Sequence, residues 1–523
     1  MRTEIVNLNS RGEGNDVVLG LAEEIAEHYS LEQKKALHLR LLTEEMIELV
    51  KSLAGDFESA VYMESNKNEC ELNFKVKTIM DEEKRKKILL STDNLSGETI
   101  ISEKVRTILE TGPYLYKKGE SIEEEGIIKA EADVINEIGD DISEKKDEAY
   151  VWSLQSYAMS SFYDEENNIN PEKWKEVRRS IIANIADDVR IYIFKDIVQV
   201  IAVYKYDEQD RNDLPIDPQF DPLKKIPVAG SVAQVKMVQL LFKNLPKKEA
   251  STEELAVTRI KIPSAAAPKG YVRTLIYEPK EVRDDDNSQC VLFIHGGAMV
   301  MPALPYHYRL ARKMAKEARC RVIMPDYHLG PKYTPPIQYN EIFDVYTYML
   351  ENAKELKIST DSIAVAGDSA GGTLAVALCL MARDRGVKMP LAQLLFYPSL
   401  DSRLESDSMK KYTSVPVCNA TAIKEYYKMC RPKGEEANSI LSSPVEAQSL
   451  SGLPDAYVET AEFDALHDDG VLYANRLRDE GGNVVLNETK GTVHAFDMAK
   501  SSKILADAMS QRIMFLRRVF GMA

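Results

Sequence analysis

One short segment, GDSAGG at residues 367–372, constrains the fold of this chain more than any other. It follows the apolar, strand-like run SIAVAG and precedes the helical run TLAVALCLMARD. A chain that turns directly from a strand into a helix needs small residues on both sides of the turn, because larger side chains would clash there. The helix that begins at this point also directs N–H groups and its positive dipole end towards the serine. The pattern therefore predicts a protruding, nucleophilic hydroxyl at Ser369.

A second motif, HGGA at residues 295–298, ends the apolar run VLFI. Two consecutive glycines after a buried strand leave their backbone amides unobstructed. Such amides can donate hydrogen bonds to the negative oxygen that forms during acyl transfer. We therefore expect an oxyanion hole made by the N–H groups of Gly296 and Gly297, completed by that of Ala370, which follows the nucleophile.

A serine hydroxyl needs a base to remove its proton, and the chain contains seven histidines. Five of them precede Ser369 in sequence and are set aside: His28, His38, His295, His307 and His328. His467 lies where a helix is expected to begin, which favours a role as a polar cap. His494 lies in GTVHAF just after a strand. The chain order nucleophile, acid, base favours His494.

The acid that orients the histidine should lie on a loop after a strand, between the nucleophile and the base. Asp464 has this position, since it follows the run AYVETAEF. Asp468 and Asp469 fit the first turn of the next helix, where acidic residues favour the helix dipole. A helix cap is the alternative role for Asp464.

The surrounding sequence predicts two domains. Four buried apolar runs alternate with amphipathic helices in the second part and indicate an α/β fold with a mostly parallel sheet: VLFIHGG, RVIMPDY, SIAVAGD and AQLLFYP. The stretch 207–230 concentrates Asp and Pro, which resist helix and sheet, and is the predicted linker. We therefore expect a first domain over residues 1–206 and a second over residues 231–523.

The pattern of residues 1–206 predicts an α+β domain. Helical periodicity runs over 31–54, and helices are also expected around 101–111, 149–164 and 171–185. Period-two alternation predicts four strands: FESAVYMES, ELNFKVKT, VRIYIF and VQVIAVYKY.

Charge and cysteine usage exclude several classes of function. The formal net charge of −16, without a basic stretch interleaved with aromatics, argues against nucleic acid as a partner. The six cysteines lack the close pairs of metal or redox motifs, so we expect free thiols and no metal site. No apolar run approaches the length of a membrane-spanning helix, and we expect a cytoplasmic protein.

Roughly residues 250–520 resemble the hormone-sensitive-lipase-like family of α/β-hydrolase esterases, in which HGGG and GDSAGG motifs occur together. The resemblance extends to ETAEFDALHDDG and VHAF. It implies an α/β-hydrolase fold with a helical cap, preceded here by the separate α+β domain, and a serine carboxylesterase that needs no cofactor. The implied roles are nucleophile for Ser369, acid for Asp464, base for His494, and oxyanion donors for Gly296, Gly297 and Ala370. Ala298 replaces the third glycine of HGGG and adds a methyl group near the acyl pocket.

Two further expectations come from resemblance. The family's cap precedes the core sheet, and residues 232–245 are the candidate for it, with a simple connecting helix as the alternative. The N-terminal half resembles degenerate histidine-kinase-like ATPase domains, but it lacks the asparagine on the first helix and the D-x-G-x-G loop. We therefore expect a regulatory or assembly role for this half, through a protein partner or self-association.

Three functions remain open at this point. The main hypothesis is hydrolysis of small, short-acyl esters. The same catalytic residues also serve hydrolysis of amide or peptide bonds. The third is a non-enzymatic interaction scaffold, which predicts loss of the catalytic residues or oxyanion glycines, and none of these is lost. Because every candidate site residue follows residue 294, we expect a chain that starts near residue 246 to keep the chemistry.

Overall fold

The computed structural model describes most of the second half of the chain and parts of the first half. The described residues are 1–54, 57–77, 128–129, 149–153, 182, 185–194, 197–206, 214–226, 232, 235, 239, 251–430 and 440–522. The chain forms two compact units, each with its own sheet. The first comprises Met1–Glu165 and Asn170–Gln209, and the second comprises Glu166–Ile169 and Asp210–Ala523. Within the described ranges, no helix is long and apolar enough to cross a lipid bilayer.

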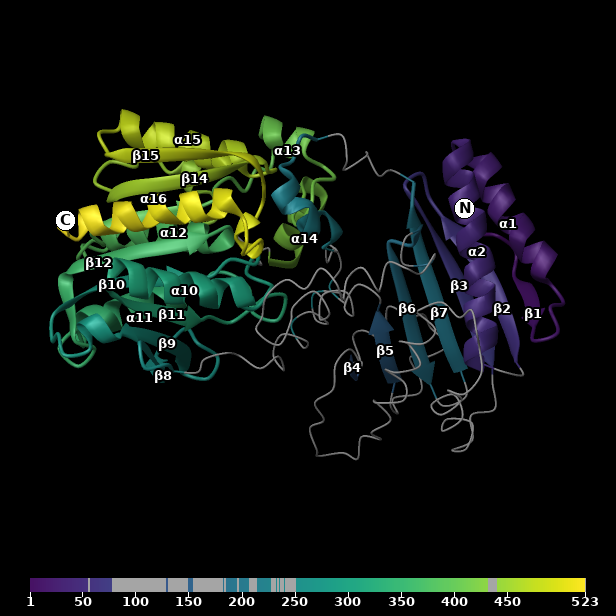
Figure 1. Cartoon of the computed structure of the whole chain (residues 1–523), viewed down its shortest axis with the longest axis horizontal. Helices are drawn as coiled ribbons and strands as arrows, with labels where there is room; N and C mark the ends of the chain where they lie inside the picture. Colours follow the sequence, from purple (N-terminus) through teal and green to yellow (C-terminus); the bar gives the residue numbers. More distant parts are fainter. Residues whose placement is uncertain are drawn as a thin grey trace. The chain divides into compact units, whose positions relative to one another are not determined.

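In its described residues, the first unit is an antiparallel sheet with helices packed on it (Figure 1). The strand order is β1-β2-β3-β7-β6-β5-β4. The described strands are β1 (Val6–Asn9), β2 (Glu58–Ser65), β3 (Glu69–Lys77), β4 (Ile128–Lys129), β5 (Ala149–Ser153), β6 (Asp188–Phe194) and β7 (Ile197–Lys205), and the helices that pack on them include α1 (Asn15–His28) and α2 (Gln33–Ala54). Apolar side chains of α1 and α2 meet those of β2, β3 and β7 in one core.

The α+β prediction for this unit is confirmed, and one predicted helix is wrong at its start. Residues 149–153 form β5 and pair with β6, where we expected a helix over 149–164. The aromatic and β-branched side chains of AYVWS fit a pleated strand, and the partner strand outweighs the helical pattern. The expected helix 101–111 lies outside the described residues. Of the expected helix 171–185, residues 182 and 185 are described, and both are helical.

The second unit is built on an eight-stranded sheet of order β15-β14-β13-β12-β10-β11-β9-β8. The six strands from β10 to β15 are parallel to one another, and β9 and β8 continue the sheet antiparallel. The strands are β8 (Leu255–Pro263), β9 (Tyr271–Pro279), β10 (Ser288–Ile294), β11 (Arg321–Asp326), β12 (Ile358–Asp368), β13 (Ala392–Phe396), β14 (Asp455–Phe463) and β15 (Val484–Val493). The predicted mostly parallel sheet is confirmed.

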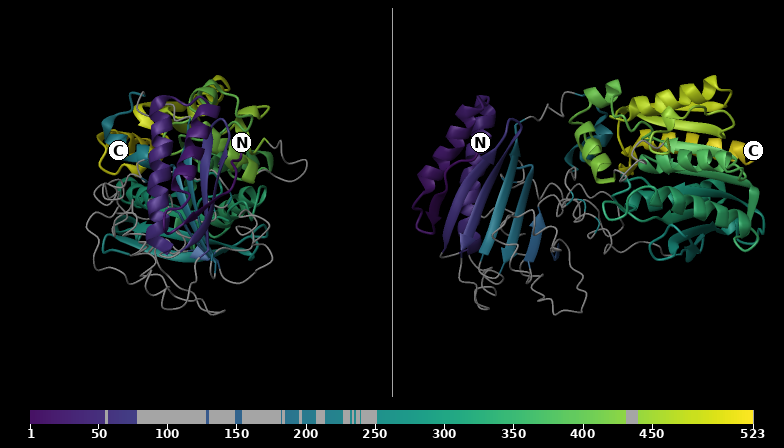
Figure 2. Two further views of the ribbon diagram at one scale, coloured as in Figure 1. Left: turned by 90° about the vertical axis from the view of Figure 1, so that its right-hand side faces the viewer. Right: turned by 180° about the vertical axis from the view of Figure 1, so that it is seen from behind.

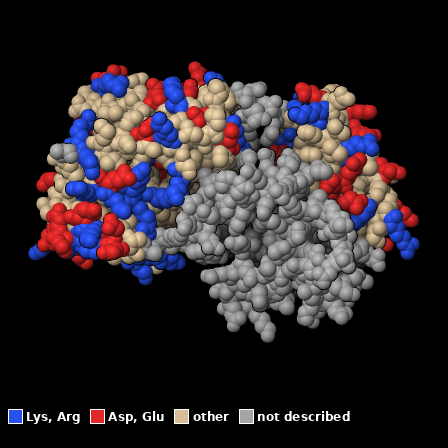
Figure 3. Space-filling view, viewed as in Figure 1, with Lys and Arg blue, Asp and Glu red and all other residues tan. Residues whose placement is uncertain are grey.

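Helices cover the sheet of the second unit (Figure 2). Helix α10 (Pro305–Ala318) packs with α16 (Lys503–Val519), and α11 (Ile337–Glu351) packs with α12 (Ala370–Asp384). Further helices among the described residues are α13 (Asp407–Lys411), α14 (Ala420–Cys430) and α15 (His467–Asp479), with 3₁₀ turns η1 (Pro218–Lys225), η2 (Lys280–Val282), η4 (Pro444–Glu446) and η5 (Phe496–Met498). On the face in Figure 3, described Lys and Arg side chains are interspersed with Asp and Glu.

The predicted linker 207–230 contains an ordered element of the second unit. Asp217 accepts a hydrogen bond from Gln219 N–H, and Pro218 occupies the first turn, so η1 begins there. Phe220 and Leu223 are fully buried. Of the predicted cap helix 232–245, only residues 232, 235 and 239 are described, and they are helical. Its role as a cap lies outside the described residues.

Candidate active site

Ser369 occupies a sharp turn between the last residue of β12 and the first of α12. Its backbone has φ 52° and ψ −122°, which costs about 1–3 kcal/mol for a residue other than glycine. A Cβ atom at Gly367 would lie 2.2 Å from the carbonyl oxygen of Gly371, and one at Gly371 would lie 2.1 Å from that of Ile294. Only glycine fits at either position, so the GDSAGG sequence allows the turn that presents the serine.

Two hydrogen bonds connect Ser369 with the predicted base and acid. His494 Nε2 lies 3.0 Å from Ser369 Oγ, and His494 Nδ1 lies 2.7 Å from Asp464 Oδ2. All three side chains are buried, with exposed fractions of 8% for the serine, 4% for the histidine and 0% for the aspartate. Because a carboxylate faces Nδ1, the imidazole proton belongs on that nitrogen, and Nε2 can accept the serine proton.

Asp464 is fixed by the loop after β14. Its second oxygen, Oδ1, accepts a hydrogen bond of 2.9 Å from the N–H of Leu466. The carboxylate therefore has one oxygen for the loop and one for His494. The arrangement holds the histidine tautomer that a general base requires.

The other histidine after the nucleophile lies in a different environment. His467 is the first residue of α15, and its ring nitrogens lie 3.0 Å from Asp468 and 3.2 Å from Glu488. Two of the histidines set aside earlier also have carboxylate partners: His307 contacts Asp368 and His328 contacts Glu341.

The oxyanion loop follows β10 and differs in one donor from the expectation. Gly296 N–H donates to Asp368 Oδ1 at 2.9 Å, so this amide is already engaged. The N–H groups of Gly297, Ala298 and Ala370 have no acceptor among the described residues. Gly297 has φ 101°, and a Cβ atom there would lie 2.8 Å from that of Met301. The geometry thus favours Gly297, Ala298 and Ala370 over Gly296 as donors.

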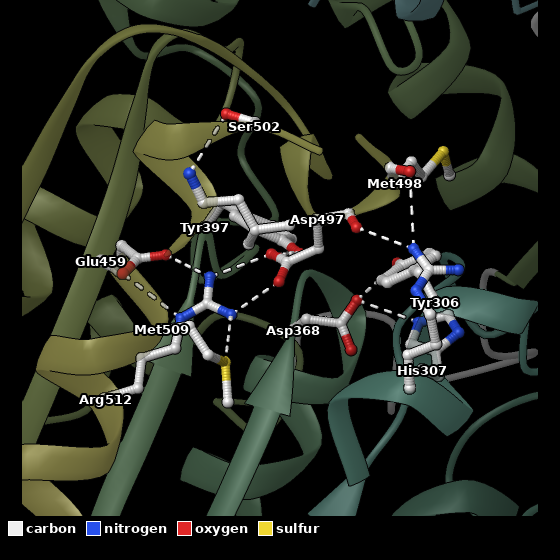
Figure 4. Close-up of polar contacts among 12 residues, drawn as sticks. Tyr306, His307, Asp368, Tyr397, Glu459, Asp497, Met498, Ser502, Met509 and Arg512 are labelled. Carbon is white, nitrogen blue, oxygen red and sulfur yellow. Dashed lines mark hydrogen bonds and ion pairs between the residues drawn. The ribbon is translucent and has the colours of Figure 1, made fainter. Parts of the chain in front are cut away.

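Asp368, which precedes the nucleophile, is a functional residue that the sequence analysis missed. It is fully buried and accepts hydrogen bonds from Tyr306 OH at 2.8 Å and His307 Nε2 at 3.1 Å, besides Gly296 N–H (Figure 4). Burial alone would raise the pKa of Asp368, but His307 and the other donors lower it below its usual value. The charged carboxylate joins the oxyanion loop to the nucleophile turn.

His295 remains uncharged beside this loop. Burial, together with the nearby His307, lowers the pKa of His295 to about 4. Its Nδ1 lies 2.8 Å from the carbonyl oxygen of Gly296, and its ring stacks on Tyr327 with centroids 4.4 Å apart. His295 therefore supports the loop by packing and by one hydrogen bond, without adding a charge next to the oxyanion hole.

Ser369 faces a cavity of about 1040 Å³. Helix α14 contributes one wall, and three tyrosines and several hydroxyl groups line the interior: Tyr339, Tyr426, Tyr427, Thr373, Ser399, Ser402 and Ser442. Ala298 lines the cavity next to the nucleophile. Among the described residues, no three His, Cys, Asp or Glu side chains gather as metal ligands. The site can therefore carry out acyl transfer to a serine, within a cavity that has partly aromatic and partly polar walls.

Several known proteins with similar sequences or structures are esterases. The sequence pattern of the alpha/beta hydrolase fold family matches residues 291–498. An arylesterase from Saccharolobus solfataricus is 34% identical over 50% of this chain and 82% of its own length. The carboxylesterase NlhH from Mycobacterium tuberculosis is 32% identical over 46% of this chain and 77% of its own. A bacterial heroin esterase structure matches with a TM-score of 0.53 and 26% identity, over 58% of this chain and 98% of its own.

Proposed function

The chain belongs to the α/β-hydrolase fold family and hydrolyses carboxylic esters, and from this premise we propose that it cleaves small, short-acyl esters through an acyl-enzyme on Ser369. The observation that carries the proposal is the chain of two short hydrogen bonds from Asp464 through His494 to Ser369. A serine, a histidine and an aspartate in this order make the hydroxyl nucleophilic at neutral pH.

In the first half of the reaction, Ser369 Oγ attacks the ester carbonyl carbon while His494 Nε2 takes the hydroxyl proton. Asp464 stabilises the imidazolium that forms. The carbonyl oxygen becomes an oxyanion and accepts hydrogen bonds from the N–H groups of Gly297, Ala298 and Ala370. The tetrahedral intermediate then collapses: the bond to the alkoxy group breaks, and His494 returns its proton to the departing alcohol.

In the second half, His494 deprotonates a water molecule that attacks the acyl carbon on Ser369. A second tetrahedral intermediate forms at the same donors, releases the carboxylic acid and returns the proton to Ser369 Oγ. Each well-placed oxyanion donor contributes about 10²–10³-fold in rate. No cofactor takes part, since every proton and electron pair stays among substrate, water, Ser369 and His494.

From the walls of the cavity we infer that the substrate has a small acyl group and a larger alcohol group. The methyl group of Ala298 stands where the related motif has glycine, beside the nucleophile, which narrows the space for the acyl chain. The remaining volume, lined by tyrosines and hydroxyls, suits an aromatic or polar alcohol. A series of p-nitrophenyl esters from acetyl to palmitoyl tests this: kcat/KM should fall steeply as the acyl chain lengthens.

We also propose a cytoplasmic location and a regulatory or assembly role for the N-terminal unit. All six cysteines are free thiols, as expected in a reducing compartment. All the proposed catalytic and oxyanion residues belong to the second unit, which leaves the first without an assigned chemical step. A protein partner or self-association remains the proposed use of that unit.

Ser369→Ala tests the assignment of the nucleophile. We expect it to abolish hydrolysis of p-nitrophenyl acetate and labelling by a fluorophosphonate probe while the circular dichroism spectrum stays unchanged, because the acyl-enzyme needs the hydroxyl. The control is Ser510→Ala, which removes an exposed hydroxyl on α16 and should keep both activities. Labelling that persists in Ser369→Ala would show that another residue is the nucleophile.

A further inference from the structure

A cluster of buried charges that is not part of the triad includes Asp497, three residues after His494, and Figure 4 shows it with Arg512 and Glu459. Arg512 on α16 bonds to Asp497 through Nη1 at 2.6 Å and Nη2 at 2.9 Å, and it also bonds to Glu459 on β14. The exposed side-chain fractions are 0% for Arg512 and Glu459 and 5% for Asp497. Tyr397 OH donates to Asp497 Oδ2 at 2.7 Å. Asp497 therefore binds both the guanidinium and a phenol hydroxyl.

Asp497 anchors the loop that carries the base. It follows His494 by three residues, and Ala495 between them has φ 51°, a left-handed conformation that is strained for alanine. Such a conformation persists only where the surroundings fix it. Besides the side-chain contacts, the carbonyl oxygen of Asp497 accepts a hydrogen bond of 3.1 Å from Arg309 Nη2 of α10. Asp497 is thus held by Arg512 of α16, by Arg309 of α10 and by Tyr397 at the end of β13.

Tyr397 connects the same cluster with the rest of the triad. Its ring lies edge-on to His494, with centroids 5.0 Å apart. Its N–H donates to the carbonyl oxygen of Glu459, five residues before Asp464. Two residues further on, Ser399 N–H donates to the carbonyl oxygen of Ser369. Tyr397 is therefore in contact with the base and with β14, which precedes the acid, and Ser399 connects the same segment to the nucleophile.

Stability alone does not account for these charges. A buried ion cluster is typically no more stabilising than apolar residues of the same size, because burial removes the hydration of each ion. Arg512 instead binds Glu459 on β14 and Asp497 on the loop that carries His494 at the same time, so the ions join these two segments in one fixed arrangement. A fixed loop keeps His494 at hydrogen-bond distance from Ser369.

We propose that Asp497, held by Arg512 and Tyr397, is a positioning residue that fixes His494 towards Ser369, a role that rests on the proposed function of His494 as base. The cluster acts through the loop and the tyrosine ring and does not touch the substrate.

The test compares two variants of the cluster with two matched controls. Tyr397→Phe removes only the hydroxyl bound to Asp497, and Asp497→Asn removes the negative charge. Tyr346→Phe removes a buried hydroxyl on α11 that donates to the carbonyl oxygen of Lys388, and Glu278→Gln removes a carboxylate paired with the buried Arg321. The measurements are kcat and KM on p-nitrophenyl acetate per folded molecule.

We expect Tyr397→Phe to lower kcat about tenfold with KM within about twofold of wild type, because misorientation of the base acts in the transition state. Asp497→Asn should lower kcat in the same way, because its side chain keeps only one accepting oxygen for the guanidinium and the tyrosine hydroxyl. The controls should keep the wild-type kcat and KM.

A wild-type kcat in Tyr397→Phe and Asp497→Asn would overturn the positioning role, whereas the proposed function would stand as long as Ser369→Ala and His494→Ala are inactive. If Asp497→Asn does not fold, the kcat of Tyr397→Phe alone tests the positioning role, and a wild-type value would overturn it. Full activity of His494→Ala would instead overturn the proposed function itself, so the two failures are distinguishable.

Discussion

At Asp368, a residue between a glycine and the nucleophile determines which amides remain available to the substrate. Its carboxylate takes the N–H of Gly296, whose partner is 72 positions away in sequence. The sequence motif could point to two consecutive glycines, but it could not indicate that one of their amides is engaged elsewhere. The oxyanion donors therefore had to be assigned by geometry, as Gly297, Ala298 and Ala370.

The two histidines after the nucleophile offer a matched pair for mutation. We expect His494→Ala to reduce kcat by about 10⁴-fold, because the serine loses the group that accepts its proton. His467→Ala should keep kcat within about twofold and cost less than about 1 kcal/mol in unfolding free energy, because it loses only partly exposed ion pairs with Asp468 and Glu488.

Steady-state kinetics and urea unfolding of both variants provide the measurement. Equal losses of kcat would mean that His467 shares the role of base, and an inactive His467→Ala beside an active His494→Ala would reverse the assignment.

The residues that sequence could identify share one property: a local pattern surrounds each of them. Ser369, Asp464 and His494 each follow an apolar strand run, and the structure brings the three together. Tyr397 and Asp497 have no such motif. Their contacts depend on Arg512, which lies on another element and could be placed beside them only by the folded sheet and helices.

At the scale of elements, η1 shows how composition can mislead. The Asp and Pro content of 207–230 predicts a linker, yet Phe220 is fully buried with its ring 6.0 Å from that of Phe496 in η5. Asp217 N–H also donates to the carbonyl oxygen of Gly491, shortly before the base. The same Asp and Pro that disfavour a long helix can start a short 3₁₀ helix, and tertiary contacts then stabilise it.

Phe220→Ala tests whether η1 supports the base loop. We expect a loss of about 3–5 kcal/mol in unfolding free energy, because a fully buried phenyl ring leaves a cavity. The kcat should also fall, because Phe496 packs between Phe220 and Tyr397, whose ring contacts His494. Phe220→Leu should recover most of both, since it keeps most of the apolar volume. Urea unfolding and kcat on p-nitrophenyl acetate measure the two effects, and an unchanged stability would show that η1 is dispensable.

At the scale of the whole molecule, the boundary of the hydrolase lies earlier than its motifs suggest. The positions of the motifs alone predict activity in a chain that starts near residue 246. That cut removes η1 and also Gln239, whose side-chain amide donates to the carbonyl oxygens of Val300 and Gly330, both at 2.6 Å. Val300 follows the oxyanion loop directly. The second unit, by contrast, includes everything from Asp210 onwards.

We therefore expect residues 210–523 to keep kcat/KM within about threefold of the full chain, whereas residues 246–523 lose more than about tenfold or become insoluble. The comparison needs the two truncated proteins and the full chain, assayed on p-nitrophenyl acetate with circular dichroism as the check on folding. An inactive, folded 210–523 protein would show that the first unit contributes directly to catalysis. Full activity of residues 246–523 would show that η1 and Gln239 are not required.

The fold of the two units was predictable to different extents. In the second unit, parallel strands buried on both faces produce long apolar runs, and these identify the sheet without knowledge of the strand order. In the first unit, strand β5 carries too short a pattern to be separated from a helix, and its assignment depends on pairing with β6. Helix α1 was not predicted, although Val18, Leu21, Ala22 and Ile25 have helical spacing and are buried in the core.

The position of Arg512 has a consequence for the order in which the enzyme becomes active during translation. A ribosome delivers the nucleophile first, then Glu459, the acid, the base and Asp497, and the arginine only afterwards, because proteins are made from the N-terminus. Until that arginine leaves the exit tunnel, Glu459 and Asp497 have no counter-ion, and burying them uncompensated would cost several kcal/mol. We therefore expect a nascent chain stalled before residue 512 to hold every member of the triad but to lack the counter-ion that fixes the loop of the base, and so to show little esterase activity until α16 has docked.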